Sequence, residues 1–238
     1  MFASFTQTYG NRPLLLDIYF RDSRLIEFKN KLDLNIYSFH NASPYIIEKF
    51  KKLNTVKNTE LLVFNDPNIN YTDTIKILKE KLKEHDCKFL FFSQDDTFSN
   101  DNKNIDFDEL IQYIKQHKVF CLNLAKIGKE SYKPSSIHKN TFNVFEYNTL
   151  DLTNIGYWGF DDTSYICTTN LLDVIYDEIY INKHDVWSAE TYLSTKFATI
   201  SMPRFLTDKA LFINYNIMGK TIHGKNEYLA KLRKRGLL

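Results

Sequence analysis

Two adjacent acids, Asp95 and Asp96, are the residues of this sequence whose types and position most suggest chemistry. They follow an apolar run in the stretch FLFFSQDDTF (89–98), and such a run predicts a buried strand that ends near the acids. Two carboxylates this close repel one another unless a cation lies between them. Their oxygens suit magnesium or manganese, and such an ion would also attract phosphate oxygens. A solvated surface turn is the alternative interpretation.

The first half of the chain alternates between short apolar runs and longer amphipathic segments, which predicts how this turn is positioned. Strands are predicted at 1–8, 34–39, 60–65, 88–93 and 119–124. Helices are predicted over 13–31, from Pro44 within 41–53, over 72–85 and over 106–117. This alternation is typical of βαβ units, so we expect an α/β fold with a mostly parallel central sheet flanked by helices.

The carboxyl ends of the first four predicted strands are all polar. They are the stretches TQTYGNR (6–12), HNAS (40–43), NDPNINYT (65–72) and SQDDTF (93–98). Open α/β sheets bind ligands where the carboxyl ends of their parallel strands meet. The four stretches should therefore converge on one crevice that includes the two acids.

The second half of the chain is less regular. A strand is predicted at 143–148, a glycine-containing loop at 154–162, and helices at 169–179 and 188–197. Neither an internal repeat nor a linker divides the sequence, so a single domain is predicted over 1–238.

Charge and composition argue against several other classes of protein. The 238 residues carry a formal net charge of +2, so no global field favours nucleic acid or membrane as a partner. Cys87, Cys121 and Cys167 form neither a Cys-x-x-Cys pair nor a zinc-ligand pattern, which favours small buried thiols. No signal peptide and no transmembrane segment are recognisable, so a cytoplasmic location is expected.

The order of the stretches TQTYGNR, HNAS, NDPNINYT and FFSQDD resembles the amino-terminal half of nucleotide-sugar glycosyltransferases of the GT-A fold. The resemblance is to the large inverting group with an Asp-x-Asp motif. It implies a GT-A (Rossmann-like) sheet, a nucleotide-sugar-binding half at 1–125 and an acceptor-side half at 126–238. It also implies a nucleotide-diphosphate sugar as donor, with a UDP-sugar as first candidate. The acceptor would be a glycan or another hydroxyl compound, and Mn²⁺ or Mg²⁺ would be the cofactor.

The same resemblance assigns residues to the nucleotide. Thr8 and Tyr9 would face the nucleoside, and Arg12 would approach its phosphates. The loops after the second and third predicted strands would add Asn41 and Asp66. These five residues would make up most of the cofactor-binding surface.

The metal site that the resemblance implies departs from the strict motif. Because no acid stands two residues before Asp96, Asp96 would bind the metal and Asp95 would bond ribose or the donor sugar. His223, in a glycine-flanked stretch, would be a second metal ligand or else an ordinary exposed histidine. Lys225 beside it would suit the diphosphate.

An inverting transfer also needs a base that takes the proton of the acceptor hydroxyl. Glu190 is the first choice, although acids also favour helix amino termini through the helix dipole alone. Asp161 and Asp162 are the rival bases. The basic end KLRKRGLL (231–238) suggests weak peripheral membrane contact, or simply a solvated helix face.

Three functions are compatible with these features. The first is metal-dependent, inverting transfer of a sugar from a nucleotide-diphosphate sugar to a hydroxyl. The second is sugar nucleotidyl transfer. That reaction would prefer a glycine-rich phosphate loop after the first strand, but the stretch 6–12 contains a single glycine, Gly10. The third is a non-catalytic GT-A-like module that binds a nucleotide or glycan. A nucleic-acid reader is not favoured, because no basic stripe precedes the last residues.

Overall fold

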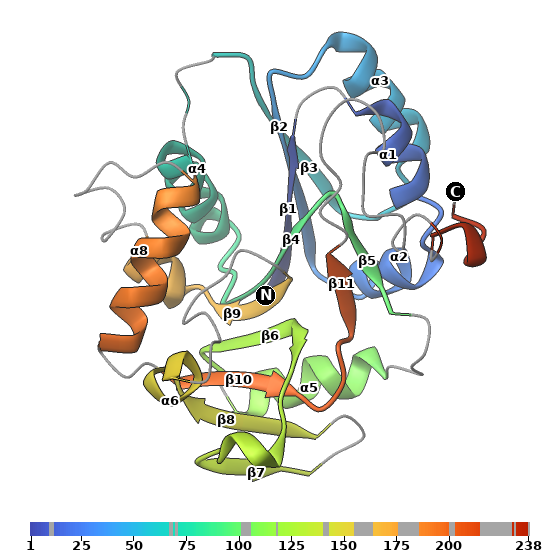
Figure 1. Cartoon of the computed structure of the whole chain (residues 1–238). Helices are drawn as coiled ribbons and strands as arrows, with labels where there is room; N and C mark the ends of the chain where they lie inside the picture. Colours follow the sequence, from blue (N-terminus) through green and yellow to red (C-terminus); the bar gives the residue numbers. More distant parts are fainter. Residues whose placement is uncertain are drawn as a thin grey trace.

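The computed structural model of the chain describes residues 1–9, 12–66, 69, 71–100, 106–117, 119–139, 143–154, 164–175, 186–199, 203–214, 230 and 232–237 (Figure 1). The strands are β1 (Phe2–Tyr9), β2 (Leu34–His40), β3 (Thr59–Phe64), β4 (Phe89–Gln94), β5 (Thr97–Ser99), β6 (Cys121–Ile127), β7 (Ser136–His138), β8 (Val144–Asn148), β9 (Tyr165–Thr168), β10 (Pro203–Thr207) and β11 (Phe212–Asn214). The helices are α1 (Pro13–Tyr19), α2 (Ser23–Asn30), α3 (Pro44–Leu53), α4 (Tyr71–Glu84), α5 (Phe107–His117), α6 (Thr149–Asn154) and α8 (Val186–Thr199), with a 3-10 turn at Glu130–Tyr132. Residues 170–175 are also helical.

A parallel core of four strands, in the order β3-β2-β1-β4, confirms the α/β fold expected for the first half. In this core, β1 pairs with β2 on one side and with β4 on the other, and Gln7 lies opposite Gln94. All four strands point the same way, so their carboxyl ends lie at one edge of the sheet. The polar stretches that follow them therefore begin at the same edge, as the sequence predicts.

Beyond β4 the sheet is mixed, and the parallel strands form its core. β9 is antiparallel to both of its neighbours, β4 and β6. β10 is parallel to β6, and β8 and β7 continue the sheet in antiparallel pairs. The strands that make these pairs are distant in sequence, so the local pattern carries no information on their direction.

The sheet is covered on both faces, as the alternation of side chains along β4 requires. Phe91 faces a core built with α1, α2, α3 and α5, whereas Leu90 and Phe92 face a second core with α4 and α8. Figure 1 shows α1, α2 and α3 on one side of the parallel strands and α4 and α8 on the other. Burial on both faces explains why β4 reads as a continuous apolar run.

The helix predicted over 13–31 is in fact two helices, α1 and α2. α1 ends at Tyr19, and α2 begins at Ser23 after the N-cap residue Asp22. The Asp22 carboxylate accepts a hydrogen bond from the backbone N–H of Leu25 at 3.1 Å. This bond satisfies a donor at the start of α2 and so favours a new helix at this point.

Candidate functional site

The acidic turn, Asp95 and Asp96, lies at the carboxyl edge of the parallel core. The backbone N–H of Asp95 donates to the carbonyl oxygen of Gln7 at 3.0 Å, which continues the pairing of β4 with β1 past Gln94. Asp95 and Asp96 are only 3% and 5% exposed. The solvated surface turn considered from the sequence is therefore wrong.

A side chain supplies a cation at this turn. Arg12, the N-cap residue of α1, places Nη2 2.5 Å from Oδ1 of Asp95. Both side chains are largely buried, at 11% and 5% exposed. A buried carboxylate is costly unless it is paired, so this ion pair accounts for the burial of Asp95. The repulsion that suggested a metal is thus offset in part by the protein.

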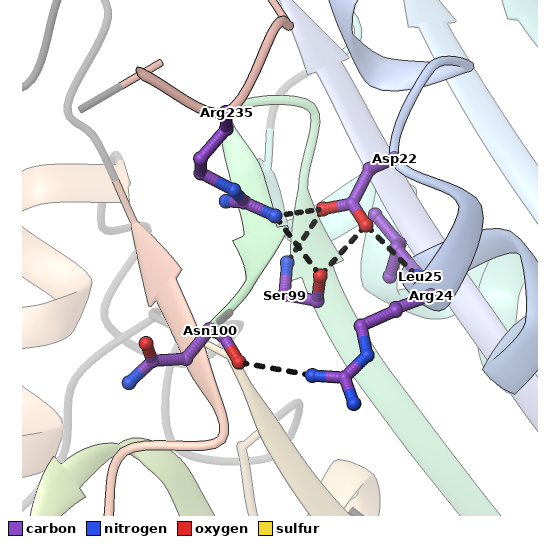
Figure 2. Close-up of polar contacts among 6 residues, drawn as sticks. All are labelled: Asp22, Arg24, Leu25, Ser99, Asn100 and Arg235. Atoms are coloured by element: carbon purple, nitrogen blue, oxygen red, sulfur yellow. Dashed lines mark hydrogen bonds and ion pairs between the residues drawn. The ribbon is translucent and has the colours of Figure 1, made fainter. Parts of the chain in front are cut away.

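A buried polar cluster around Asp22 holds β5, the strand that follows the acidic turn (Figure 2). The Asp22 carboxylate accepts hydrogen bonds from the backbone N–H and the hydroxyl of Ser99, both at 2.7 Å. Arg235, near the end of the chain, lies 3.4 Å from Asp22 and donates to the Ser99 hydroxyl at 3.2 Å. Residues from α2, β5 and the C-terminal segment are thereby joined at one point.

The residue after β5, Asn100, links this cluster to the residues that directly precede β11. Its backbone N–H and its side-chain amide donate to the carbonyl oxygens of Leu211 at 2.9 Å and Ala210 at 2.8 Å. Arg24 donates to the Asn100 carbonyl oxygen at 3.5 Å (Figure 2). The acidic turn is therefore bounded by β4 on one side and by a firmly bonded β5 on the other. Sequence reasoning missed β5 and this cluster, because its members are far apart in the chain.

A second buried polar group lies beneath the same edge, on the α2 face of β1. Lys29 is fully buried, and its Nζ donates to Thr6 Oγ1 at 2.5 Å and Ser4 Oγ at 3.2 Å. Thr6 in turn lies 3.1 Å from the hydroxyl of Ser93 on β4. Burial lowers the pKa of Lys29 well below its ordinary value of 10.5. Among the described residues, Lys29 forms no ion pair with an acid.

The predicted nucleotide-binding residues fall at the expected edge but differ in exposure. Thr8 is 3% exposed, and its hydroxyl donates to the carbonyl oxygen of Ser38. Asn41 and Asp66 are exposed after β2 and β3, and Asn41 adopts a left-handed backbone with φ of 51°. Tyr9 ends β1, and its side chain lies outside the described residues. Their roles toward a ligand remain predictions.

Several predicted site residues lie outside the described part of the chain. They are Asp161, Asp162, His223 and Lys225. Glu190 belongs to α8, but its side chain is not among those described. Within the described residues, no group of three or more His, Cys, Asp or Glu side chains could hold a metal ion.

His40, at the end of β2, is a polar residue at this edge that the sequence analysis did not single out. The ring centres of His40 and Phe64 lie 4.9 Å apart, and Nε2 of His40 lies 3.5 Å from the hydroxyl oxygen of Thr74. Partial burial lowers the pKa of His40, which favours the neutral ring. Its position at a strand end, next to Asn41, is the signal that could have identified it.

The fold is an α/β fold of the GT-A type, with a parallel core in a mixed sheet flanked by helices. Crystal structures of Staphylococcus aureus TarS (1–349) in complex with UDP and with UDP-GlcNAc match at 14% and 15% identity, with TM-scores of 0.54 and 0.53. These two matches cover 90% and 91% of this chain. This chain in turn spans 60% and 59% of the matched TarS chains, and 36% of the chain in a longer TarS structure. HddC from Yersinia pseudotuberculosis matches at 16% identity and a TM-score of 0.54, over 99% of this chain and 100% of its own.

No family model and no curated protein matches the chain. The similarity to known proteins therefore concerns the fold. In the part of the chain that is described, no helix has the length and apolar character needed to cross a bilayer.

Proposed function

We propose that this chain is a glycosyltransferase that moves a sugar from a nucleotide-diphosphate sugar to a hydroxyl acceptor, with inversion at the anomeric carbon. The observation that carries the proposal is the buried acidic turn at the carboxyl edge of a GT-A sheet. Two structures with this fold contain UDP and UDP-GlcNAc, which supports a UDP-sugar as the donor. In open α/β sheets, this edge is where ligands bind.

A divalent ion fits the chemistry of this turn, although through few protein ligands. The ion pair with Arg12 occupies Asp95, so Asp96 is the residue we assign to Mn²⁺ or Mg²⁺. Small hard cations accept carboxylate oxygens and usually keep several water or phosphate ligands, so one acid suffices. When bound, such an ion would offset negative charge on the departing diphosphate. His223 is proposed as a further ligand.

The protein groups have distinct parts in this proposal. The Arg12–Asp95 ion pair fixes Arg12, the N-cap residue of α1, against the acidic turn, beside the surface that would meet the donor. Thr8, Tyr9, Asn41 and Asp66 would contact the nucleotide, with Lys225 at its diphosphate. A base must then accept the proton of the acceptor hydroxyl as it attacks. We assign Glu190 to this role, with Asp161 and Asp162 as the alternatives.

Turnover assays separate this proposal from a module that only binds. The chain is incubated with UDP-GlcNAc and other nucleotide sugars, Mn²⁺ and a panel of hydroxyl acceptors, and release of UDP is measured. Glu190→Gln should retain donor affinity and slow transfer by about 10²-fold or more, because only proton removal is lost. Undiminished transfer by Glu190→Gln would move the role to Asp161 or Asp162. Donor binding without turnover by any acceptor would favour the binding module.

Sugar nucleotidyl transfer is distinguished in the same assay by its products. That reaction consumes a nucleoside triphosphate and a sugar phosphate and releases pyrophosphate. The single glycine in 6–12 argues against it, because such chemistry favours a glycine-rich loop around the triphosphate. Pyrophosphate release with a triphosphate and a sugar phosphate, without UDP release from a nucleotide sugar, would overturn our assignment.

A further inference from the structure

Two cysteines that are distant in sequence face one another in the middle of the sheet. Cys121 begins β6 and lies directly opposite Cys167 of the antiparallel strand β9. Directly opposed residues of an antiparallel pair point to the same face. Both belong to the core shared with α4 and α8, where Cys167 is fully buried and Cys121 is partly buried.

The hydrogen bonds around this pair define which type of antiparallel position it occupies. The N–H of Thr168 donates to the carbonyl of Phe120 at 3.2 Å, and the N–H of Leu124 donates to the carbonyl of Ser164 at 2.8 Å. These bonds mark 120/168 and 124/164 as hydrogen-bonded positions of the pair. Hydrogen-bonded and non-hydrogen-bonded positions alternate along antiparallel strands, so Cys121 and Cys167 form a non-hydrogen-bonded pair. Such a pair has a Cα separation of about 4.5 Å, within the range that a disulfide spans.

We propose that Cys121 and Cys167 are a disulfide-forming site, at which a peroxide or a small-molecule disulfide oxidises the two thiols to a covalent bond between β6 and β9. With hydrogen peroxide, the Cys121 sulfur attacks one oxygen to give a sulfenic acid and one water. The Cys167 sulfur then displaces the sulfenic hydroxyl, which leaves as a second water after taking up the Cys167 proton. Two thiols and one peroxide thus yield one disulfide and two waters.

The environment of the two thiols sets the order and the speed of these steps. Cys121 reacts first because it is the one with access to solvent. Burial, and to a smaller extent the neighbouring Cys121, raises the pKa of Cys167 well above its ordinary value. Thiolates are the attacking species, so the second step should be slow at neutral pH and faster in alkali.

The bond would join the two halves of the sheet. β9 is the strand that connects the parallel core, through β4, to the strands β6, β10, β8 and β7. Cys167 lies opposite Leu90 near the start of β4, whereas Asp95 follows the end of that strand. Asp95 is five residues along the chain from Leu90, which corresponds to about 17 Å of strand. Oxidation should therefore stabilise the sheet and leave the acidic turn unaltered.

The test uses the folded chain and peptide mapping. The protein is treated with hydrogen peroxide or with oxidised glutathione, the remaining thiols are alkylated, and the unreduced digest is analysed by mass spectrometry. We expect one cross-link between the peptides of Cys121 and Cys167, and an unfolding midpoint that rises on oxidation and returns on reduction. Cys87→Ser is the matched control and should retain both effects, while Cys121→Ser should lose both.

Two results would overturn the proposal. One is a folded protein that forms no cross-link under conditions that oxidise the same thiols after unfolding. The other is a cross-link through Cys87, whose thiol is buried on the same face. Because the decisive reading is made on the unsubstituted chain, it does not depend on whether a variant folds. It also involves neither donor nor acceptor, so its outcome is independent of the proposed transfer activity.

Discussion

Asp95 and Lys29 are both buried charged residues beside the central strands β1 and β4, and the fold treats them in opposite ways. Asp95 meets the guanidinium of Arg12 at 2.5 Å, so its carboxylate lies beside a cation. Lys29 donates to the hydroxyls of Ser4 and Thr6, and its Nζ lies 4.6 Å from the ring centre of Tyr37. Burial lowers the pKa of Lys29, which favours its neutral form. The ion pair allows the Asp95 carboxylate to be buried at the edge where a ligand would bind. In the interior, burial instead favours the neutral amine of Lys29.

The largest effect should come from breaking the pair at the acidic turn. Arg12→Met leaves the Asp95 carboxylate buried without its cation, which should lower the free energy of unfolding by about 3 kcal/mol. The double variant Arg12→Met/Asp95→Asn should recover part of this loss, because no unpaired charge remains. Urea unfolding at neutral pH measures both. Equal stabilities for the unsubstituted chain and Arg12→Met would show that the ion pair does not account for the burial.

A smaller loss is expected at the cluster that holds β5. Asp22→Asn removes the charge that faces Arg235 and places an amide N–H₂ among the donors of Leu25 and Ser99. The free energy of unfolding should therefore fall by about 2 kcal/mol. Asp108→Asn is the matched control, since the exposed Asp108 pairs with Lys31 at the surface and should change stability by about 0.5 kcal/mol or less. Similar small losses for both variants would mean that the Asp22 cluster does not anchor β5.

The smallest effect, taken over a single pH unit, is the pH dependence of stability that Lys29 causes. Above pH 10.5, Lys29 is neutral in both states, but below it the unfolded chain binds a proton that the folded chain does not. Stability therefore falls as the pH falls from 10.5 toward the lowered folded pKa, by up to about 1.4 kcal/mol per pH unit. Lys29→Met should remove this slope. The free energy of unfolding of the variant, minus that of the unsubstituted chain, should therefore increase as the pH is lowered from 10 to 8. Denaturant unfolding across this range measures it, and a constant difference would show that Lys29 stays protonated when buried.

The parallel core could be predicted from sequence because its strands are short apolar runs that alternate with helical segments, and β1, β2 and β4 are buried on both faces. The direction of β9 could not, since it depends on pairing with residues more than 40 positions away in the chain. The position of the acids at the end of β4 also followed from the local pattern. Their environment did not, because Arg12 lies 83 residues before Asp95 and Arg235 lies 213 residues after Asp22. Lys29 lies within a stretch predicted only as helix, and its burial comes from packing of α2 on β1.

The proposed function requires that a nucleotide-sugar donor binds at the acidic turn. Calorimetric titration with UDP-GlcNAc, with and without Mn²⁺, tests it in the unsubstituted chain, in Asp96→Asn and in the control Asp108→Asn. We predict Mn²⁺-dependent binding in the unsubstituted chain and the control, and affinity about 10-fold or more weaker in Asp96→Asn, because a metal ligand is lost. Binding of equal strength in all three proteins, or binding that is indifferent to Mn²⁺, would contradict the account.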